Sequence, residues 1–201
     1  MSKDVFEMLC SMDRKKVELQ IVLQCAPTLS GLKTSNLLIL PREQERSAHY
    51  ALRGIGLIGY RLAYDRHRVV LLVFRKEMLM HYLKREDVRI FLQSLGYEGS
   101  FGISLAHFQK RYQDFVNRRM NFPHEMGIFL GYPLCDVKGF IDNEGDNFRM
   151  VGYWKVYQNV HQTKKLFQQF DDIKDDMVCR LSKGDSLETI MKESVKHSLA
   201  S

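Results

Sequence analysis

The chain has 201 residues, of which 45% are hydrophobic, 27% are charged and 11% are aromatic. This length and hydrophobic content are sufficient for a core without disulfides, and they exclude an intrinsically disordered protein. The formal net charge of +6 makes the protein basic, but the charge is modest beside that of dedicated nucleic-acid-binding proteins. No apolar run approaches the roughly 20 residues that a membrane span needs.

The cysteines and the N-terminus predict a cytoplasmic protein. Cys10, Cys25, Cys135 and Cys179 are far apart and fit no CxxC or zinc-site spacing, so we expect reduced thiols. The first residues lead into a helical pattern rather than into the basic and then apolar sequence of a signal peptide. We therefore expect no association with a membrane.

Apart from a helix at residues 43–58, the first 74 residues predict one helix, one loop and three strands. Residues 4–24 have the apolar spacing of a single amphipathic helix, and Pro27 and Gly31 then predict a loop. Residues 36–40 form a short apolar run that suits a buried strand. Residues 60–74 predict a β-hairpin, because β-branched and aromatic residues lie on both sides of a polar turn.

The rest of the chain is predicted to be mostly helical. Helical spacing is found at residues 43–58, 77–83, 86–95, 104–117, 159–181 and 186–197. Pro123 and Pro133 open two further short helices, because proline favours the first helical position. Residues 148–157 are the last expected strand, and residues 183–201 are expected to form a frayed helical tail.

These elements predict an α+β fold. About four strands, one pair of them the hairpin at residues 60–74, alternate irregularly with helices. This order favours a small, mostly antiparallel sheet covered by helices over a doubly wound parallel sheet. Residues 1–201 contain no repeat and no linker, so we predict a single domain.

Four stretches of the sequence together carry a family resemblance. They are CAPTLSGLK at residues 25–33, VFRK at residues 73–76, FPHEMGIFLGYPLCDVKGFI at residues 122–141 and GYWKVY at residues 152–157. In this order they resemble domain-of-unknown-function family 3793, and the likeness spans nearly the whole chain.

This resemblance implies a cytosolic, single-domain protein of anaerobic microbes and supplies no established activity. It also implies a link to iron, haem or flavodoxin-type redox metabolism, so that iron or haem is the cofactor to consider, although the sequence requires none. The chain departs from the family at Thr34 and Cys135, where proline and an acidic residue are expected. Cys135 is therefore a poor candidate for any shared chemistry.

The first functional hypothesis is a binding or accessory protein with no chemistry of its own. Cationic side chains group around the predicted hairpin and could bind a phosphate-bearing ligand or an acidic protein partner such as a flavodoxin. These residues are Arg61, Arg66, Arg68, Arg75 and Lys76. The same residues also fit a solvated sheet face whose edge is protected by charge.

The second hypothesis is a cysteine-dependent hydrolase or acyl transferase. Cys25 would be the nucleophile and His124 the base, with Glu125 or Asp136 orienting the imidazole. The same two residues, Cys25 and His124, would be the ligands of any bound metal, although no zinc-site spacing is present. Against both roles, a buried cysteine often does nothing more than pack in a core.

A weaker alternative is nucleic-acid binding through residues 125–141, whose glycine and apolar spacing resembles a helix-turn-helix. The expected recognition helix, residues 134–142, contains one lysine, two aspartates and no arginine. This composition is poorly suited to phosphates and base edges. The sequence therefore gives no strong nucleic-acid signal.

Overall fold

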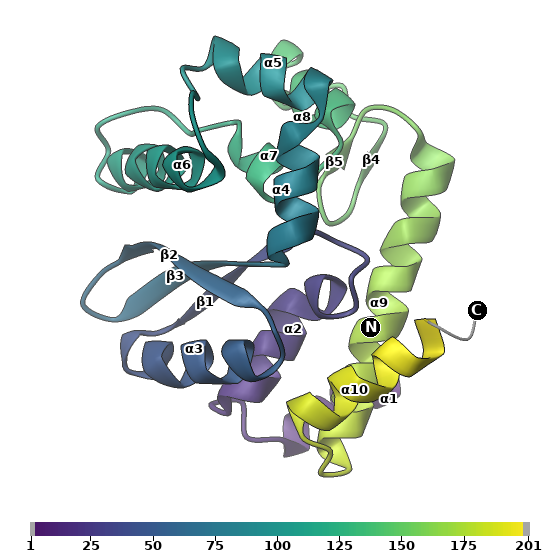
Figure 1. Cartoon of the computed structure of the whole chain (residues 1–201). Helices are drawn as coiled ribbons and strands as arrows, with labels where there is room; N and C mark the ends of the chain where they lie inside the picture. The colour runs from purple at the N-terminus through teal and green to yellow at the C-terminus, as the bar shows by residue number, and fades with distance from the viewer. Residues whose placement is uncertain (1–2, 199–201) are drawn as a thin grey trace.

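In the computed structural model, which describes residues 3–198, a small sheet lies between two layers of helices (Figure 1). The strands are β1 (Ser35–Pro41), β2 (Ile58–Tyr64), β3 (Arg68–Phe74), β4 (Met150–Val151) and β5 (Lys155–Val156). The helices before the hairpin β4–β5 are α1 (Lys3–Ser11), α2 (Val17–Leu29), the 3-10 helix η1 (Arg42–Gln44), α3 (Glu45–Gly54), α4 (Lys76–Lys84), α5 (Glu86–Ser94), α6 (Phe101–Val116), α7 (Met126–Phe129) and α8 (Leu134–Asp142). Two helices follow it, α9 (Val160–Ser182) and α10 (Leu187–Ser198).

The main sheet has β3 at its centre. Its order is β1–β3–β2, and both outer strands are antiparallel to β3. Successive side chains of a strand point to opposite faces, so Val69, Leu71 and Val73 enter one core. Leu72 and Phe74 enter the other core. The strand is apolar on both sides because helices cover both faces of the sheet.

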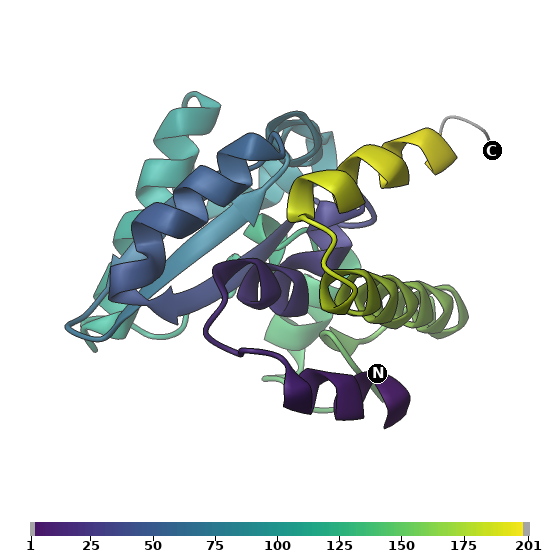
Figure 2. The ribbon, with the colours of Figure 1, turned by 90° about the horizontal axis from the view of Figure 1, so that it is seen from below.

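The first core lies between the sheet and α2 and α3, with α1, α9 and α10 packed beyond α2. Figure 2 shows this layer from below, and α2 contacts both α3 and α9. The second core lies on the other face, under α4 to α8. At its centre the rings of Phe108 and Phe129 stack with their centroids 4.2 Å apart.

A third, smaller apolar cluster joins the hairpin β4–β5 to α9. It is formed by Trp154, Val156, Phe167 and Phe170. From this hairpin α9 runs past the sheet to α1 and α10, so this helix joins the two layers (Figure 1). The position of the hairpin against α8 and α9 determines the geometry of the site described below.

The α+β fold with a small antiparallel sheet is confirmed. The hairpin at residues 60–74 is also confirmed, with β2 and β3 as its two strands. Its turn is closed by the carboxylate of Asp65, which accepts the backbone N–H groups of His67 and Arg68, each at 2.7 Å. The local β-branched pattern and the polar turn were therefore sufficient to predict this element.

The single helix predicted over residues 4–24 is wrong, because α1 and α2 are separate helices. A turn around Asp13 divides them. The Asp13 carboxylate accepts the Lys15 N–H at 2.9 Å, and the Asp13 carbonyl accepts the Lys16 N–H at 3.1 Å. A short polar side chain that bonds to its own backbone competes with the helix, and here it interrupts an apolar pattern that continues on both sides.

The loop predicted from Pro27 is also wrong, because α2 continues through Pro27 to Leu29. Proline removes one helical hydrogen bond, but contacts from outside hold the last turn of this helix. Arg75 donates to the carbonyl oxygens of Thr28 and Leu29, at 2.9 and 2.5 Å. These charge-assisted bonds satisfy carbonyls that a helix end leaves free.

One prediction for the C-terminal part needs correction. Residues 148–157 form the two-stranded hairpin β4–β5 rather than one strand, which gives five strands in the described chain. Within residues 183–201, the start of α10 packs into the first core through Leu187, Ile190 and Met191, all of which are buried. Residues 199–201 lie outside the described chain.

Candidate functional site

Three of the four stretches that carry the resemblance meet where the hairpin β4–β5 approaches α7 and α8. Lys33, in the turn before β1, places its ammonium nitrogen 4.9 Å from the ring centroid of Tyr132. Tyr132 in turn stacks on Trp154 of the hairpin, with centroids 4.8 Å apart and ring planes 26° apart. Lys33, Tyr132 and Trp154, which are far apart in the sequence, thus pack against one another in a row.

A cavity of about 250 Å³ opens beside this stack, and we call it the aromatic cavity. Its aromatic lining comes from the segment before α7, from α8 and its preceding turn, and from the hairpin. These aromatic side chains are Phe122, Tyr132, Phe140, Tyr153 and Trp154. Leu130 and Val137 complete much of the apolar surface. Aromatic faces presented in this way favour a planar apolar guest.

The Tyr132–Trp154 wall is held firmly in place. The Tyr132 carbonyl accepts a hydrogen bond from the Tyr82 hydroxyl, and the Trp154 ring packs edge-on against Phe167 at 4.5 Å. Ring positions fixed by such contacts lose little further freedom when a ligand binds.

Asp136 attaches the hairpin to α8 from beneath the cavity. Its side chain is only 3% exposed. One carboxylate oxygen accepts the Trp154 indole N–H at 2.8 Å, and the other accepts the backbone N–H groups of Tyr157 and Gln158 at 2.8 and 3.1 Å. Three protein donors therefore stabilise this buried carboxylate by hydrogen bonding, and its role here is structural.

Lys155 and His124 provide the cationic and polar groups of the lining. The Lys155 ammonium donates to the Gly145 carbonyl at 2.6 Å and lies 4.8 Å from the ring centroid of Phe148. The His124 ring is exposed and contacts the ring of Phe140 at 5.5 Å. Lys155 thus contributes a cationic side chain to a lining that is otherwise largely apolar.

Lys33 is a buried amine behind Tyr132. Its side chain is 5% exposed, and no carboxylate of the described residues lies within 4 Å of it. Burial lowers the pKa of Lys33 from its usual 10.5 to about 7, opposed in part by its electrostatic interaction with Cys25. Near neutral pH a large fraction of this amine is therefore uncharged.

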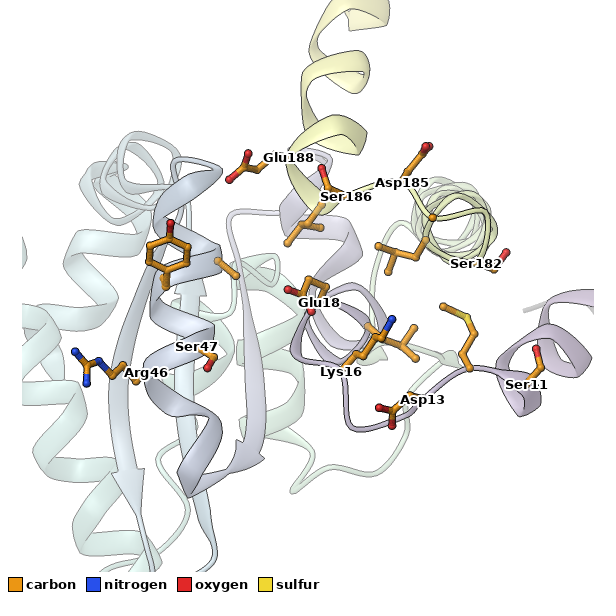
Figure 3. Close-up of a pocket in the computed structure, with 17 residues that line it drawn as sticks. Ser11, Asp13, Lys16, Glu18, Arg46, Ser47, Ser182, Asp185, Ser186 and Glu188 are labelled. Carbon is orange, nitrogen blue, oxygen red and sulfur yellow. The ribbon is translucent and has the colours of Figure 1, made fainter.

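A second, larger cleft of about 950 Å³ lies between the α1–α2 turn, α3 and the α9–α10 turn, and we call it the large cleft. Figure 3 shows Arg46 on the α3 wall, Asp185 on the opposite wall, and Lys16 and Glu18 between them. Its rim carries exposed acidic and basic side chains. Because both charges are present and face water, they indicate no particular class of ligand.

The comparisons distinguish between these two cavities. A family model described as "Protein of unknown function (DUF3793)" matches residues 21–191. The chain belongs to this family. Residues before 21 supply 6 of the 17 residues that line the large cleft, whereas the whole lining of the aromatic cavity lies within the DUF3793 match. A property common to DUF3793 proteins is therefore better sought in the aromatic cavity. No curated protein and no solved structure matches the chain.

The structure places Cys25 in the first core. Its side chain is fully buried, and its thiol contacts the Leu37 carbonyl at 3.8 Å. Burial raises the pKa of Cys25 from its usual 9.0 to about 12, and the positive charge of Lys33 opposes this only in part. A nucleophilic cysteine needs the opposite shift, so these surroundings argue against the proposed hydrolase or acyl transferase.

The other residues of that hypothesis lie elsewhere and have other partners. His124 lines the aromatic cavity, and no contact among the described residues joins it to Cys25. Glu125 is buried, accepts the Tyr97 hydroxyl at 3.0 Å and forms an ion pair with Arg111, so it does not orient His124. Asp136 holds Trp154 instead of an imidazole. The thiol–imidazole arrangement is thus not assembled.

Alkylation should reflect this burial. In native protein treated with N-ethylmaleimide, we expect the exposed Cys10 to react and Cys25 to remain unmodified, because reagent and base cannot reach a buried thiol. In denaturant both should react. Peptide mass spectrometry after timed quenching measures the two rates in one sample, so Cys10 serves as the internal control. Native modification of Cys25 at a rate close to that of Cys10 would restore the nucleophile hypothesis.

The five cationic residues predicted to form one patch lie at different ends of the hairpin. Arg66 and Arg68 are at its turn, whereas Arg75 and Lys76 follow the other end of β3, which is seven residues long. At about 3.4 Å per residue a strand of this length separates the two groups widely. Arg61 is ion-paired with Glu45 at 3.4 Å, and Arg75 is occupied by the carbonyls at the end of α2.

The segment predicted to resemble a helix-turn-helix, residues 125–141, contains the four-residue helix α7 and the longer α8. A Cβ atom on Gly127 would lie 2.8 Å from Val137, so α7 and α8 pack closely at this glycine. However, only Lys138 and Asp142 of α8 are exposed, and α8 contacts β5. A recognition helix needs an exposed face, which α8 does not offer.

Two further findings concern metals and membranes. Among the side chains that the structure describes, no group of three or more His, Cys, Asp or Glu residues could hold a metal ion. None of the described helices is long and apolar enough to cross a membrane.

Four residues at the site were not among the candidate site residues of the sequence. Tyr132, Trp154 and Lys155 line the cavity, and Lys33 lies against the Tyr132 ring. The available signal was the density of aromatic residues in 122–141 and 152–157, the stretches that carry the resemblance. That density does not indicate which rings face a cavity and which face the core.

Proposed function

We propose that the protein is a binding protein whose aromatic cavity holds a small, planar, largely apolar ligand. The observation that carries this proposal is the fixed Tyr132–Trp154 stack on the wall of a cavity lined by three further aromatic rings. Aromatic side chains bind planar molecules through stacking and edge contacts in addition to apolar burial. The volume of about 250 Å³ lies just below the range of drug-sized pockets, so the ligand is small.

A binding role agrees with the chemistry of the cavity better than an enzymatic role does. The one carboxylate among the described lining residues, Asp136, already accepts three hydrogen bonds. The thiol required by the cysteine hypothesis is buried in a different core. The proposal is therefore capture of a ligand, with the protein acting as a carrier, sensor or accessory component.

A link to iron, haem or flavodoxin-type metabolism receives no support from these contacts. At about 250 Å³ the aromatic cavity lies below the range of about 300–1,000 Å³ typical of ligand pockets, so it is too small to enclose a haem macrocycle. A flavodoxin would need one continuous cationic face, and the basic residues of the hairpin are divided between its two ends. The proposal accordingly concerns a small planar molecule in the aromatic cavity.

The sequence has one tryptophan, Trp154, and this permits a direct test. Cinnamamide, a neutral planar molecule, is titrated into the protein while heat and Trp154 emission are recorded. We expect saturable binding with a matching change in emission, because Trp154 lines the cavity. Tyr132→Leu should weaken this binding about tenfold, because it removes a ring of the cavity lining that also packs against Trp154.

Tyr50→Leu is the matched control, because Tyr50 is an exposed tyrosine on the wall of the large cleft. Its affinity for cinnamamide should equal that of the wild type. Thermal unfolding of both variants checks that each is folded. Absence of saturable binding, or binding that is lost in Tyr50→Leu and retained in Tyr132→Leu, would contradict the proposal.

A further inference from the structure

We infer that the ligand of the aromatic cavity is an aromatic or conjugated carboxylate, or a similar small planar anion, whose charged group binds Lys155. The inference rests on the proposed function and names its ligand class. Three observations carry it, namely the position of the Lys155 side chain, the absence of a carboxylate within 4 Å of its ammonium among the described side chains, and the engagement of both Asp136 oxygens by protein hydrogen-bond donors.

Lys155 is placed by the hairpin and by two rings. It begins β5, which pairs with β4 and contacts α8. Its ammonium lies 4.8 Å from the ring centroid of Phe148 and 5.7 Å from that of Phe140, and Phe140 itself lines the cavity. Cation–π contacts of this kind hold a lysine head group against an apolar wall. The charge therefore stays at the cavity.

The ammonium of Lys155 keeps donors for a ligand. One of its three N–H groups is used by the Gly145 carbonyl at 2.6 Å. Glu144 and Asp146 flank Gly145, but none of the carboxylates among the described side chains lies within 4 Å of the Lys155 nitrogen. Two N–H donors are thus available to an acceptor that enters the cavity.

The remaining charges of the lining favour an anion. Asp136 is the only acid among the described lining residues, and its two oxygens accept hydrogen bonds from Trp154, Tyr157 and Gln158. Its charge is therefore already solvated by the protein and competes weakly for Lys155. A cationic guest would meet the Lys155 ammonium without a free carboxylate to compensate. A carboxylate guest gains charge-assisted hydrogen bonds at an apolar wall, where such bonds are stronger than in water.

The test compares two ligands of the same shape and different charge. Calorimetric titrations with cinnamate and with cinnamamide are carried out on the wild type, on Lys155→Met and on Lys164→Met. Methionine preserves a long apolar side chain over Phe140 and Phe148 and removes the charge. Lys164 is an exposed lysine of α9 outside the cavity and provides the matched control.

In the wild type and in Lys164→Met, cinnamate should bind about tenfold more tightly than cinnamamide, the effect of one charge-assisted contact at a partly exposed site. In Lys155→Met the two affinities should become equal, through a loss for cinnamate alone. Lys155→Arg should restore a preference for cinnamate, which separates charge from a general effect on folding. Raising the salt concentration should reduce the preference in the wild type.

The outcomes separate this inference from the function on which it rests. If neither ligand binds, the proposed function fails, and the inference fails with it. If both bind the wild type equally, the function stands and the anionic ligand class is overturned. If Lys155→Met is folded and keeps the tenfold preference, the anion is bound by another group and the assignment to Lys155 is wrong.

Discussion

Lys33→Met is expected to raise the free energy of unfolding at pH 7 by about 2–4 kcal/mol, an unusual gain for a single substitution. Lys33 is 5% exposed and has no carboxylate partner within the described residues, and burial lowers its pKa from 10.5 to about 7. At neutral pH the folded protein therefore either holds a buried charge or gives up a proton that the unfolded chain would keep. Methionine fills the same space without this penalty.

The effect depends on pH with a definite sign. Because the folded pKa of Lys33 is the lower one, the unfolded chain binds more protons between about pH 7 and pH 10.5, and stability rises with pH in this window. The buried Cys25 acts in the opposite direction, since its pKa is raised from 9.0 to about 12, but only above pH 9. From pH 7 to pH 9 the Lys33 contribution is about 2 kcal/mol.

Denaturant unfolding at pH 7, 8 and 9 measures both effects. The stability difference between Lys33→Met and the wild type should shrink by about 2 kcal/mol over this range. Lys164→Met, an exposed lysine of α9, should follow the wild type at every pH because its ammonium is in water in both states. If Lys33→Met is instead less stable than the wild type by the same free energy of unfolding at pH 7, 8 and 9, the folded protein stabilises the charged Lys33 amine and this prediction is wrong.

The sequence predicted those elements whose cause is local. The hairpin β2–β3 follows from β-branched residues around a turn that Asp65 closes, and its register needs no distant partner. Helices α4, α5 and α6 likewise follow from apolar spacing and the residues that end them. Local patterns failed where a distant residue determines the structure. Helix α2 continues past Pro27 because Arg75, 47 residues away from Thr28, binds the last carbonyls of the helix.

The candidate site could be predicted only in part, for the same reason. Lys33 had the sequence signature of a surface residue, because lysine is almost never fully buried, and only the packing of Tyr132 over it changes that expectation. Asp136 was selected for its chemistry, but its partner is Trp154 of the hairpin, 18 residues further along the chain. Cys25 and His124 were paired by residue type, and the fold places one in a core and the other at a cavity.

Asp136→Leu is expected to lower the free energy of unfolding by about 3–5 kcal/mol. Leucine has a similar shape but no acceptor, so the Trp154 indole N–H and the backbone N–H of Tyr157 lose their partners inside the protein. Each buried donor left without an acceptor costs about 1–3 kcal/mol. The Gln158 N–H adds less, because that residue is exposed and water can replace the carboxylate.

Asp136→Asn distinguishes the roles of the two carboxylate oxygens, because it replaces one of them with an NH₂ group. One amide oxygen can still accept the Tyr157 and Gln158 N–H groups, whereas the amide NH₂ then faces the Trp154 indole N–H, donor against donor. We expect a loss of about 1–3 kcal/mol, smaller than that of Asp136→Leu, and a red shift of Trp154 emission as the ring loosens and water approaches it.

Asp142→Leu is the matched control for both variants, because Asp142 is an exposed aspartate of the same helix and should change stability by less than about 0.5 kcal/mol. Denaturant unfolding and Trp154 emission are measured together, so that loss of stability and movement of the cavity wall are recorded on the same sample. Because Trp154 is part of that wall, Asp136→Asn should also weaken cinnamamide binding at temperatures where the variant is folded. Wild-type stability in Asp136→Leu would show that the hairpin is held on α8 by apolar packing alone, and the rigid stack on which the binding proposal depends would then need another support.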